Sequence, residues 1–387
     1  MSSAAVFPEQ EYHDRCKSAQ VLMKDADLAA LLLTCEADVR YFTGFLTRFW
    51  ESPTRPWFLV LPAEGTPVAV IPSIGAALMR GTWITDIRTW RSPDYEDDGV
   101  SLLANTLREI VPAGERIGVP SGQETHLRMP LADWNRLQAA LPDRTFTKDS
   151  AILRRLRMVK SRAEIAKIAA ACQVADRAFA RVPEIARAGV ALNDIFRRFQ
   201  MLALEEGADW VPYLAGGAGA GGYVDVISPA TSATVNDGDV LMIDTGLVRE
   251  GYFCDFDRNF SVGPARADVA AAHSRLVEAT AAAFDLARPG VTAADLFVVM
   301  DRIVTGGAGG VDTGRFGHGL GMQLTEPPSL IPADDTVLTA GMVLTLEPGI
   351  ALADGRMMVH EENIVIRETG AEWLSKPSAS DIRVLEP

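Results

Sequence analysis

The sequence predicts a two-domain α+β protein, with a smaller α/β domain at residues 1–154 and a larger domain at residues 155–387. The chain has 387 residues, which is more than one hydrophobic core usually accommodates. Hydrophobic residues make up 48% of it and charged residues 23%, an ordinary balance for a folded protein. Helix and strand patterns alternate in the first part, and the second part combines long helices with paired strands.

The N-terminal domain begins with a helical pattern from Glu11 to Lys24, followed by apolar runs that are typical of buried strands. The runs are LAALLLT, WFLVLPAEG and PVAVIP, and two further helical patterns are SLLANTLREIV and LADWNRLQAAL. This alternation predicts an α/β domain. The segment PDRTFTKDSAILRRLRMVKSRAEI then connects the two domains.

The second domain opens with a long helix, because Ser161 and Glu164 have the spacing of a capping box. The Gly-rich run AGGAGAGGYVDV contains a GxGxxG match, but no helix follows it as a dinucleotide site requires. We therefore expect a flexible loop there. Further helices are expected at 192–206, 267–288 and 293–305, and strands around VLMIDTG, GYFCDFDRNFSV, VLTLEPGI and MMVHEENIVI.

Charge and cysteine usage exclude several classes of protein. The formal net charge of -14 repels phosphate backbones and anionic membrane surfaces, so we expect neither nucleic acid nor membrane as a partner. The four cysteines include no CxxC pair, which favours a reducing cytoplasm over a disulfide framework or a thiolate zinc site. No export signal or long apolar segment is evident, so we predict a cytoplasmic protein.

Acidic residues interrupt the apolar strands of the second domain. Asp244 and Asp255 are 11 residues apart and joined by TGLVREGYF, so a hairpin would place both carboxylates on one face. Asp257 follows Asp255 by two residues and faces the same side by strand alternation. Glu347 ends one later apolar run, and Glu361 interrupts another together with its neighbour Glu362.

A buried ionised carboxylate without a partner is costly, so acids in such apolar strands require a nearby cation or base. His318 in GHGLGMQLTEPP adds one imidazole. Carboxylate oxygens with one imidazole suit a divalent Mn, Co, Fe or Zn ion. Taken singly, each of these residues also fits a solvent-facing or packed position, so the prediction of a metal site depends on their joint arrangement.

That joint arrangement resembles a known family. The order Asp244, Asp255, His318, Glu347 and Glu361, carried by DTGLVREGYFCD, GHGLG, LTLEPGI and HEENIVIRETG, is similar to the pita-bread family of creatinase, prolidase, aminopeptidase P and methionine aminopeptidase. The segments YFTGF and LRRLRMVKSRAEI point to the creatinase and proline-peptidase branch. The resemblance implies a pita-bread catalytic domain after a creatinase-like N-terminal domain, and a homodimer.

The resemblance also implies a site with two divalent metal ions. Asp255 and Glu361 would bridge both ions, Asp244 would bind one, and His318 with Glu347 would bind the other. In relatives the last ligand is followed by two residues and an apolar triplet, which selects Glu361 over Glu362. His318 and Glu347 would be catalytic, with Glu347 taking a proton from metal-activated water and passing it towards the leaving nitrogen.

The sequence departs from the family at several substrate positions. Thr325 stands where GHGxGxxxHExP has its second histidine, and a histidine expected before the first aspartate is absent, leaving Tyr223 and Asp225 as the nearest polar candidates. Loss of one oxyanion donor typically costs about two to three decades in rate. Asp257 replaces the Thr of the DxTR pattern and would be an extra ligand, a substrate-amine anchor or a partner for Arg258.

Two further features have alternative interpretations. His360 immediately precedes Glu361, so strand alternation predicts that it turns away from the metals. In RYFTGFLTRFWESPTRPWF, Arg48 and Trp50 are candidate substrate-specificity residues, because Arg with aromatics can hold a carboxylate or a small cation. Ordinary edge packing is the alternative for Arg48 and Trp50.

Three functions fit the sequence. The first is a metal-dependent hydrolase resembling Xaa-Pro aminopeptidase or prolidase, which cleaves a C–N amide bond in a short peptide or other small substrate. The second is a non-peptidic hydrolase or lyase on the same fold, similar to creatinase, ectoine hydrolase or dimethylsulfoniopropionate lyase, which the missing histidines favour. The third is a non-catalytic pita-bread binding module, although no ligand position of the family is lost here.

Overall fold

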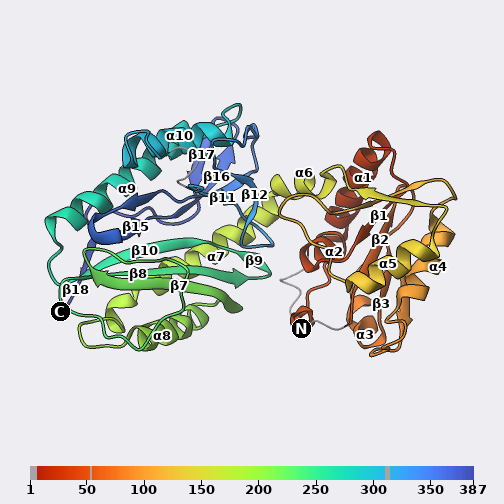
Figure 1. Cartoon of the computed structure of the whole chain (residues 1–387), viewed down its shortest axis with the longest axis horizontal. Helices are drawn as coiled ribbons and strands as arrows, with labels where there is room; N and C mark the ends of the chain where they lie inside the picture. The colour runs from red at the N-terminus through yellow and green to blue at the C-terminus, as the bar shows by residue number, and fades with distance from the viewer. Residues whose placement is uncertain (1–6, 53–54, 310–313) are drawn as a thin grey trace. The chain divides into compact units, whose positions relative to one another are not determined.

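The computed structural model describes residues 7–52, 55–309 and 314–387. The chain divides into two compact units, Met1–Arg157 and Met158–Pro387, each of mixed helix and strand (Figure 1). Among the described residues, no helix is both long and apolar enough to cross a membrane. All four cysteines are free and buried.

The first unit is built on one mixed sheet of six strands in the order β4-β3-β2-β1-β5-β6. Its antiparallel pairs are β1–β2 and β2–β3, and its parallel pairs are β1–β5, β3–β4 and β5–β6. The strands are β1 (Ala30–Leu33), β2 (Phe58–Pro62), β3 (Val68–Pro72), β4 (Asp86–Trp90), β5 (Arg116–Val119) and β6 (Thr145–Lys148). The helices are α1 (Glu9–Asp25), α2 (Glu36–Thr43), α3 (Ala76–Met79), α4 (Val100–Ile110), α5 (Leu131–Ala140) and α6 (Ile152–Met158), the last of which crosses the boundary between the units.

The second unit contains two larger sheets between two layers of helices (Figure 1). One sheet has the order β18-β10-β8-β7 with β9 paired to β8, the other has the order β12-β11-β13-β16-β17, and β14 pairs with β15. The helices are α7 (Arg162–Ala180), α8 (Leu192–Glu205), α9 (Ala267–Leu286) and α10 (Ala293–Val304). The strands are β7 (Trp210–Ala220), β8 (Asp239–Arg249), β9 (Tyr252–Phe253), β10 (Phe256–Val262), β11 (His318–Gly319), β12 (Glu326–Ser329), β13 (Val343–Leu346), β14 (Gly349–Ala351), β15 (Met357–Val359), β16 (Glu362–Arg367), β17 (Gly370–Trp373) and β18 (Arg383–Leu385).

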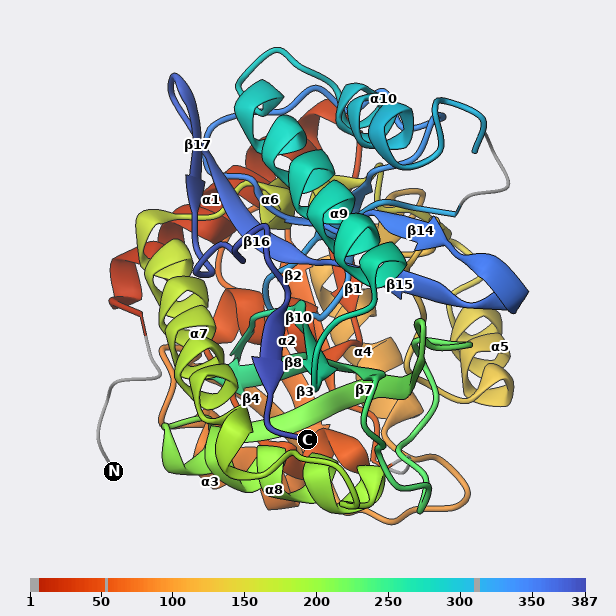
Figure 2. The ribbon, with the colours of Figure 1, turned by 90° about the vertical axis from the view of Figure 1, so that its left-hand side faces the viewer.

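Each sheet of the second unit is covered by helices on one face. Figure 2 shows α9 running across the sheet that contains β16, and apolar side chains of α9 and α10 form one core with that sheet. The other face of each sheet is therefore free to carry the acidic residues.

The predicted capping box begins α7, since the Ser161 hydroxyl accepts from the Glu164 N–H at 3.2 Å and the Glu164 carboxylate accepts from the Ser161 N–H at 2.9 Å.

The Gly-rich run does not form the predicted loop over its first part. Strand β7 extends through Ala220 and pairs with β8 along its length, so the loop prediction is wrong for residues 215–220. A Cβ atom at Gly216 would lie 2.2 Å from the Met242 carbonyl oxygen and 3.0 Å from the Phe196 ring. The backbone is thus packed too closely for a side chain at that position, which the sequence pattern does not reveal.

Candidate metal centre

The first group of acidic residues lies on neighbouring antiparallel strands. Asp257 on β10 is directly opposite Asp244 on β8, and Asp255 precedes Asp257 by two residues and so faces the same side. Their exposed fractions are 7% for Asp244, 4% for Asp255 and 1% for Asp257. The predicted hairpin therefore brings all of these carboxylates to one buried face.

The second group comes from the other sheet. His318 lies on β11, Glu347 follows β13 directly, and Glu361 immediately precedes β16. His318 and Glu361 are buried, whereas Glu347 is only partly buried. Glu347 is therefore the acid of this group that solvent or a substrate can reach most readily.

Asp255, His318 and Glu361 converge, since one ligand atom of each lies within 4.8 Å of the others. The His318 Nε2 atom is 3.5 Å from Asp255 Oδ2, and its Nδ1 atom is 2.9 Å from the Gly319 carbonyl oxygen. A carbonyl oxygen can only accept, so Nδ1 carries the proton and the Nε2 lone pair faces the carboxylates. This arrangement suits a divalent metal ion with Asp255, His318 and Glu361 as its ligands.

Asp244 and Glu347 belong to the same electrostatic cluster. Burial, followed by the charges of Asp257 and Glu347, raises the pKa of Asp244 well above its usual value. Burial and then the charge of Asp257 raise the pKa of Glu347 to about 7. Within the described residues, Asp244 Oδ1 and Glu361 Oε1 are buried without a hydrogen-bond partner. A bound cation would compensate for these costs, so the residues present fit a metal.

Burial also shifts the pKa values of the other candidate ligands. It raises the pKa values of Asp255 and Glu361 well above their usual range, with neighbouring acids adding to the effect. It lowers the pKa of His318 to about 4, so this imidazole is neutral near pH 7 and its lone pair is available.

Sequence reasoning missed Tyr213, on β7. Tyr213 pairs with Gly246 of β8, two residues from Asp244, so the Tyr213 and Asp244 side chains share one face of the sheet. Burial and then the charge of Asp244 raise the pKa of Tyr213, so the phenol keeps its proton and can orient Asp244. The aromatic run WVPYL just after α8 was the available signal, but the glycines that follow it obscured the strand.

The predicted substrate residues of the second unit lie in varied surroundings. Tyr223 is buried, and its hydroxyl accepts from the Val359 N–H at 2.6 Å. The Asp225 carboxylate is partly exposed and accepts from the N–H groups of Ile227 at 3.1 Å and Ser228 at 2.8 Å. Thr325 is partly buried and directly precedes β12.

The predicted substrate residues of the first unit pack locally. Trp50 is 8% exposed, and its ring centroid is 5.8 Å from that of Trp57. Arg48 is more exposed, with its NH2 atom 3.6 Å from Glu51 Oε1. A role for Arg48 and Trp50 in substrate binding therefore stays a prediction.

Asp257 and His360 lie close together. The His360 Nδ1 atom is 3.5 Å from Asp257 Oδ1, whereas the Arg258 guanidinium pairs with Glu362 at 3.0 Å. The alternation argument for His360 does not apply, because the chain leaves β15 at Val359 and enters β16, in another sheet, at Glu362.

Comparison with known families decides the identity of the fold. Residues 166–368 match the model of metallopeptidase family M24, and residues 15–159 match that of the creatinase/prolidase N-terminal domain. The chain belongs to metallopeptidase family M24. It is therefore a metal-dependent hydrolase, and the predicted two-domain creatinase-like architecture is confirmed.

Similar M24 proteins are named as dipeptidases. The chain is 32% identical over 369 residues to the "Probable dipeptidase PepE" of Mycobacterium tuberculosis, with 94% of each chain covered. It is 27% identical over 316 residues to the "Xaa-Pro dipeptidase" of Lactobacillus delbrueckii subsp. lactis, covering 81% of this chain and 83% of the relative. The crystal structure of dipeptidase PepE from Mycobacterium ulcerans has a TM-score of 0.84 at 29% identity, covering 98% of this chain and 100% of that chain.

Proposed function

We propose that this M24 protein is a dipeptidase of the Xaa-Pro type that uses two divalent metal ions. The observation that carries the proposal is the convergence of Asp255, His318 and Glu361 beside unpartnered oxygens of Asp244 and Glu361. Relatives that align along most of the chain are named dipeptidases or Xaa-Pro dipeptidases, which supports a short peptide as substrate.

In this proposal, Asp255 and Glu361 would be shared by the two ions, Asp244 would hold one ion, and His318 and Glu347 would hold the other. Such ions lower the pKa of a bound water and polarise the peptide carbonyl. The oxygen-rich ligand set with one imidazole suits Mn, Co, Fe or Zn. The Tyr213 hydroxyl, on the same face of the sheet, would hold the Asp244 carboxylate in place by donating to it.

Glu347 is the proposed general base. It is the least buried of the proposed carboxylate ligands, so a bound water and the leaving nitrogen of a substrate can reach it most readily. It would take a proton from the water and pass it to the leaving nitrogen. His318 acts as a ligand whose orientation is fixed by the Gly319 carbonyl oxygen.

The proposal also includes the location of the protein, its oligomeric state and its substrate-binding residues. Buried free thiols suit a reducing cytoplasm, and the family resemblance favours a homodimer. Arg48, Trp50, Tyr223, Asp225, Thr325 and Asp257 remain candidates for substrate binding or for support of the site.

Metal analysis and a substrate panel test the function. Protein purified without chelator should contain a divalent metal, and Mn²⁺-loaded protein should hydrolyse Xaa-Pro dipeptides faster than non-prolyl dipeptides or Xaa-Pro tripeptides. Glu347→Gln should lower kcat by about 100- to 10,000-fold. His318→Ala should lose metal, whereas His126→Ala, a control at an exposed histidine of the first unit, should not.

The outcomes separate the competing functions. Metal-loaded protein that cleaves no peptide of the panel would contradict the dipeptidase proposal and favour a non-peptidic substrate. Protein that binds no divalent metal under any loading condition would contradict the metal centre itself.

A further inference from the structure

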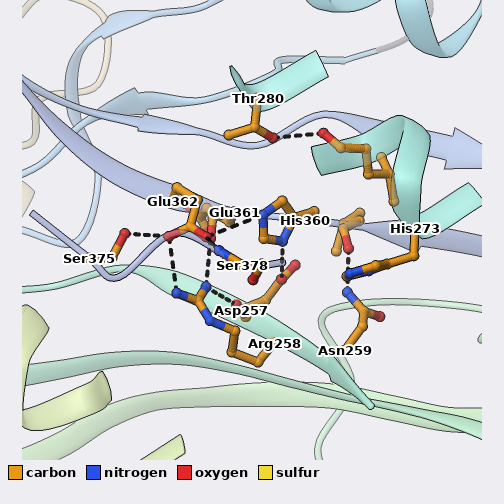
Figure 3. Close-up of polar contacts among 12 residues, drawn as sticks. Asp257, Arg258, Asn259, His273, Thr280, His360, Glu361, Glu362, Ser375 and Ser378 are labelled. Atoms are coloured by element: carbon orange, nitrogen blue, oxygen red, sulfur yellow. Dashed lines mark hydrogen bonds and ion pairs between the residues drawn. The ribbon is translucent and has the colours of Figure 1, made fainter. Parts of the chain in front are cut away.

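Two short segments, residues 255–258 and 360–363, carry one proposed ligand each and meet where the two sheets of the second unit approach. Asp255 begins the first segment, and Glu361 lies in the second. Polar side chains of both segments bond across this junction (Figure 3). The contacts therefore bear on the distance between ligands that belong to different sheets.

Asn363 makes the first connection, two residues after Glu361. Its Oδ1 atom accepts from the Asp255 N–H at 3.0 Å, and its amide group donates to the Asp255 carbonyl oxygen. The backbone of Asp255 is thereby held through both of its polar groups by one side chain of β16.

Arg258 makes the second connection. Its NH1 atom donates to the backbone carbonyl oxygens of Asp257 and Glu361, the latter at 3.2 Å, and its NH2 atom pairs with Glu362. The guanidinium thus uses the backbone of Asp257 and leaves its carboxylate to another partner. The interpretation of Asp257 as the ion-pair partner of Arg258 is therefore disfavoured.

His360 makes the third connection, on the other side of Glu361. It lies between two carboxylates, with Nδ1 3.5 Å from Asp257 Oδ1 and Nε2 3.3 Å from Glu362 Oε1. Figure 3 shows the imidazole pointing towards Asp257, with Glu362 held in turn by Arg258 and Ser375. The position of His360 is thus fixed from the side away from Asp257.

Burial raises the pKa of Asp257, and among the described residues His360 opposes this effect most, ahead of the charge of Arg258. Both of its carboxylate oxygens are buried without a hydrogen-bond partner, and only 1% of the residue is exposed. So small an exposure leaves almost no surface for a substrate amine, which disfavours the anchor interpretation. The imidazole of His360 is the nearby group that can stabilise this charge.

We propose that Asp257 and His360 act as a positioning pair that sets the distance between Glu361 and the ligands Asp244 and Asp255, and thereby the affinity of the metal site. Asp257 is directly opposite Asp244 on β8, and His360 is bonded in the chain to Glu361. Movement of either partner therefore displaces a ligand of its own sheet. The inference rests on the proposed metal centre, but it adds residues that hold no metal themselves.

Three variants test the pair: Asp257→Asn, His360→Gln and the double variant. The Mn²⁺ dissociation constant of each is measured by competition with a chelating dye. Each single change should weaken binding by about 10- to 100-fold, as loss of a group supporting a metal ligand typically does. The Mn²⁺ dissociation constant of the double variant should be at most about threefold larger than the larger of the two single-variant constants, because the two residues act as a unit. Activity should recover when Mn²⁺ is raised to saturation.

His273→Gln is the matched control. His273 is 3% exposed, its ring centroid lies 6.0 Å from that of His360, and its Nε2 atom is 3.1 Å from the Ala379 carbonyl oxygen. This variant should lower the melting temperature and leave the Mn²⁺ dissociation constant unchanged. If His360→Gln fails to fold, Asp257→Thr, which restores the residue common in the family pattern, should still weaken Mn²⁺ binding.

Several results would overturn the pair. The pair is contradicted if the Mn²⁺ dissociation constants of the single variants lie within about twofold of that of the unaltered protein. It is also contradicted if the fold-changes of the two single variants multiply in the double variant. Loss of metal in Asp257→Asn with normal binding in His360→Gln would instead make Asp257 a direct ligand. An unaltered protein that binds no metal would refute the proposed function, which is a separate failure.

Discussion

Lowering the pH from about 7.5 to about 5.5 should weaken metal binding at this site by at least about 25-fold, because protons compete with the cation for Glu347 and for the other buried acids. The pKa of Glu347 in the metal-free protein is raised to about 7. A metal can bind only to the ionised form, so the dissociation constant grows by the factor 1 + 10^(pKa − pH). This factor is about 1.3 at the higher pH and about 33 at the lower one.

The same pKa shift makes the folded protein without metal less stable as the pH rises. Because Glu347 has a higher pKa when folded than when unfolded, the folded state holds the proton more tightly, and its stability falls between about pH 4.5 and about pH 7. The loss amounts to about 3 kcal/mol at about 1.4 kcal/mol per pKa unit. Burial lowers the pKa values of His273 and His318 to about 4. Their effect on stability is opposite to that of Glu347, because they make the folded state less stable as the pH falls below about 6.5.

Metal affinity is therefore a cleaner measurement than stability. His318 is already neutral above about pH 5.5 and adds little to the pH dependence of binding. Calorimetric titration with Mn²⁺, in two buffers of different ionisation enthalpy, gives both the affinity and the number of protons released. Glu347→Gln should release about one proton fewer near pH 6. An affinity constant within threefold across this pH range would refute the electrostatic description of the site.

Two further predictions concern groups that support the site. Gly317→Ala should reduce metal content. A Cβ atom at this position would lie 2.2 Å from the Thr345 carbonyl oxygen, and the φ of +132° disfavours a side chain, so the backbone before His318 would be displaced. Full metal occupancy in this variant, found by metal analysis, would contradict the prediction. Lys160 Nζ lies 3.1 Å from Glu326 Oε2, and the two side chains are only 1% and 3% exposed. Lys160→Met should therefore lower the free energy of unfolding, measured by urea titration, by about 3–5 kcal/mol. A change below about 1 kcal/mol would contradict this prediction.

The shared face of Asp244, Asp255 and Asp257 could be predicted from local pattern, whereas the family resemblance implied the roles of His318, Glu347 and Glu361. The spacing of Asp244 and Asp255 and strand alternation at Asp257 require only a regular hairpin, and β8 and β10 pair in that way. The choice between Glu361 and Glu362 also agrees with the structure. Glu361 joins the cluster with His318, whereas Glu362 pairs with Arg258.

The supporting residues could not be predicted, because they depend on contacts between distant segments. Tyr213 lies near Asp244 because β7 pairs with β8 in a register that places Tyr213 opposite Gly246, on the same face as Asp244. His360 faces Asp257 because the chain changes sheets between β15 and β16, which interrupts the alternation that the sequence suggests. Both are properties of tertiary structure.

By the family resemblance, the substrate side of the proposed centre would carry fewer polar groups than in relatives, and this bears on how the enzyme would stabilise its transition state. Thr325 would stand at the position of a family histidine, and its hydroxyl can donate a hydrogen bond. Its neighbour Glu326 is fixed by Lys160 at 3.1 Å and by the Gln323 N–H at 3.1 Å, so the backbone beside Thr325 is held by a buried ion pair. By the family resemblance, the site would then have a hydroxyl where relatives have an imidazole. Catalysis would then depend more heavily on the metal ions, and hence on the buried residues that hold their ligands in place.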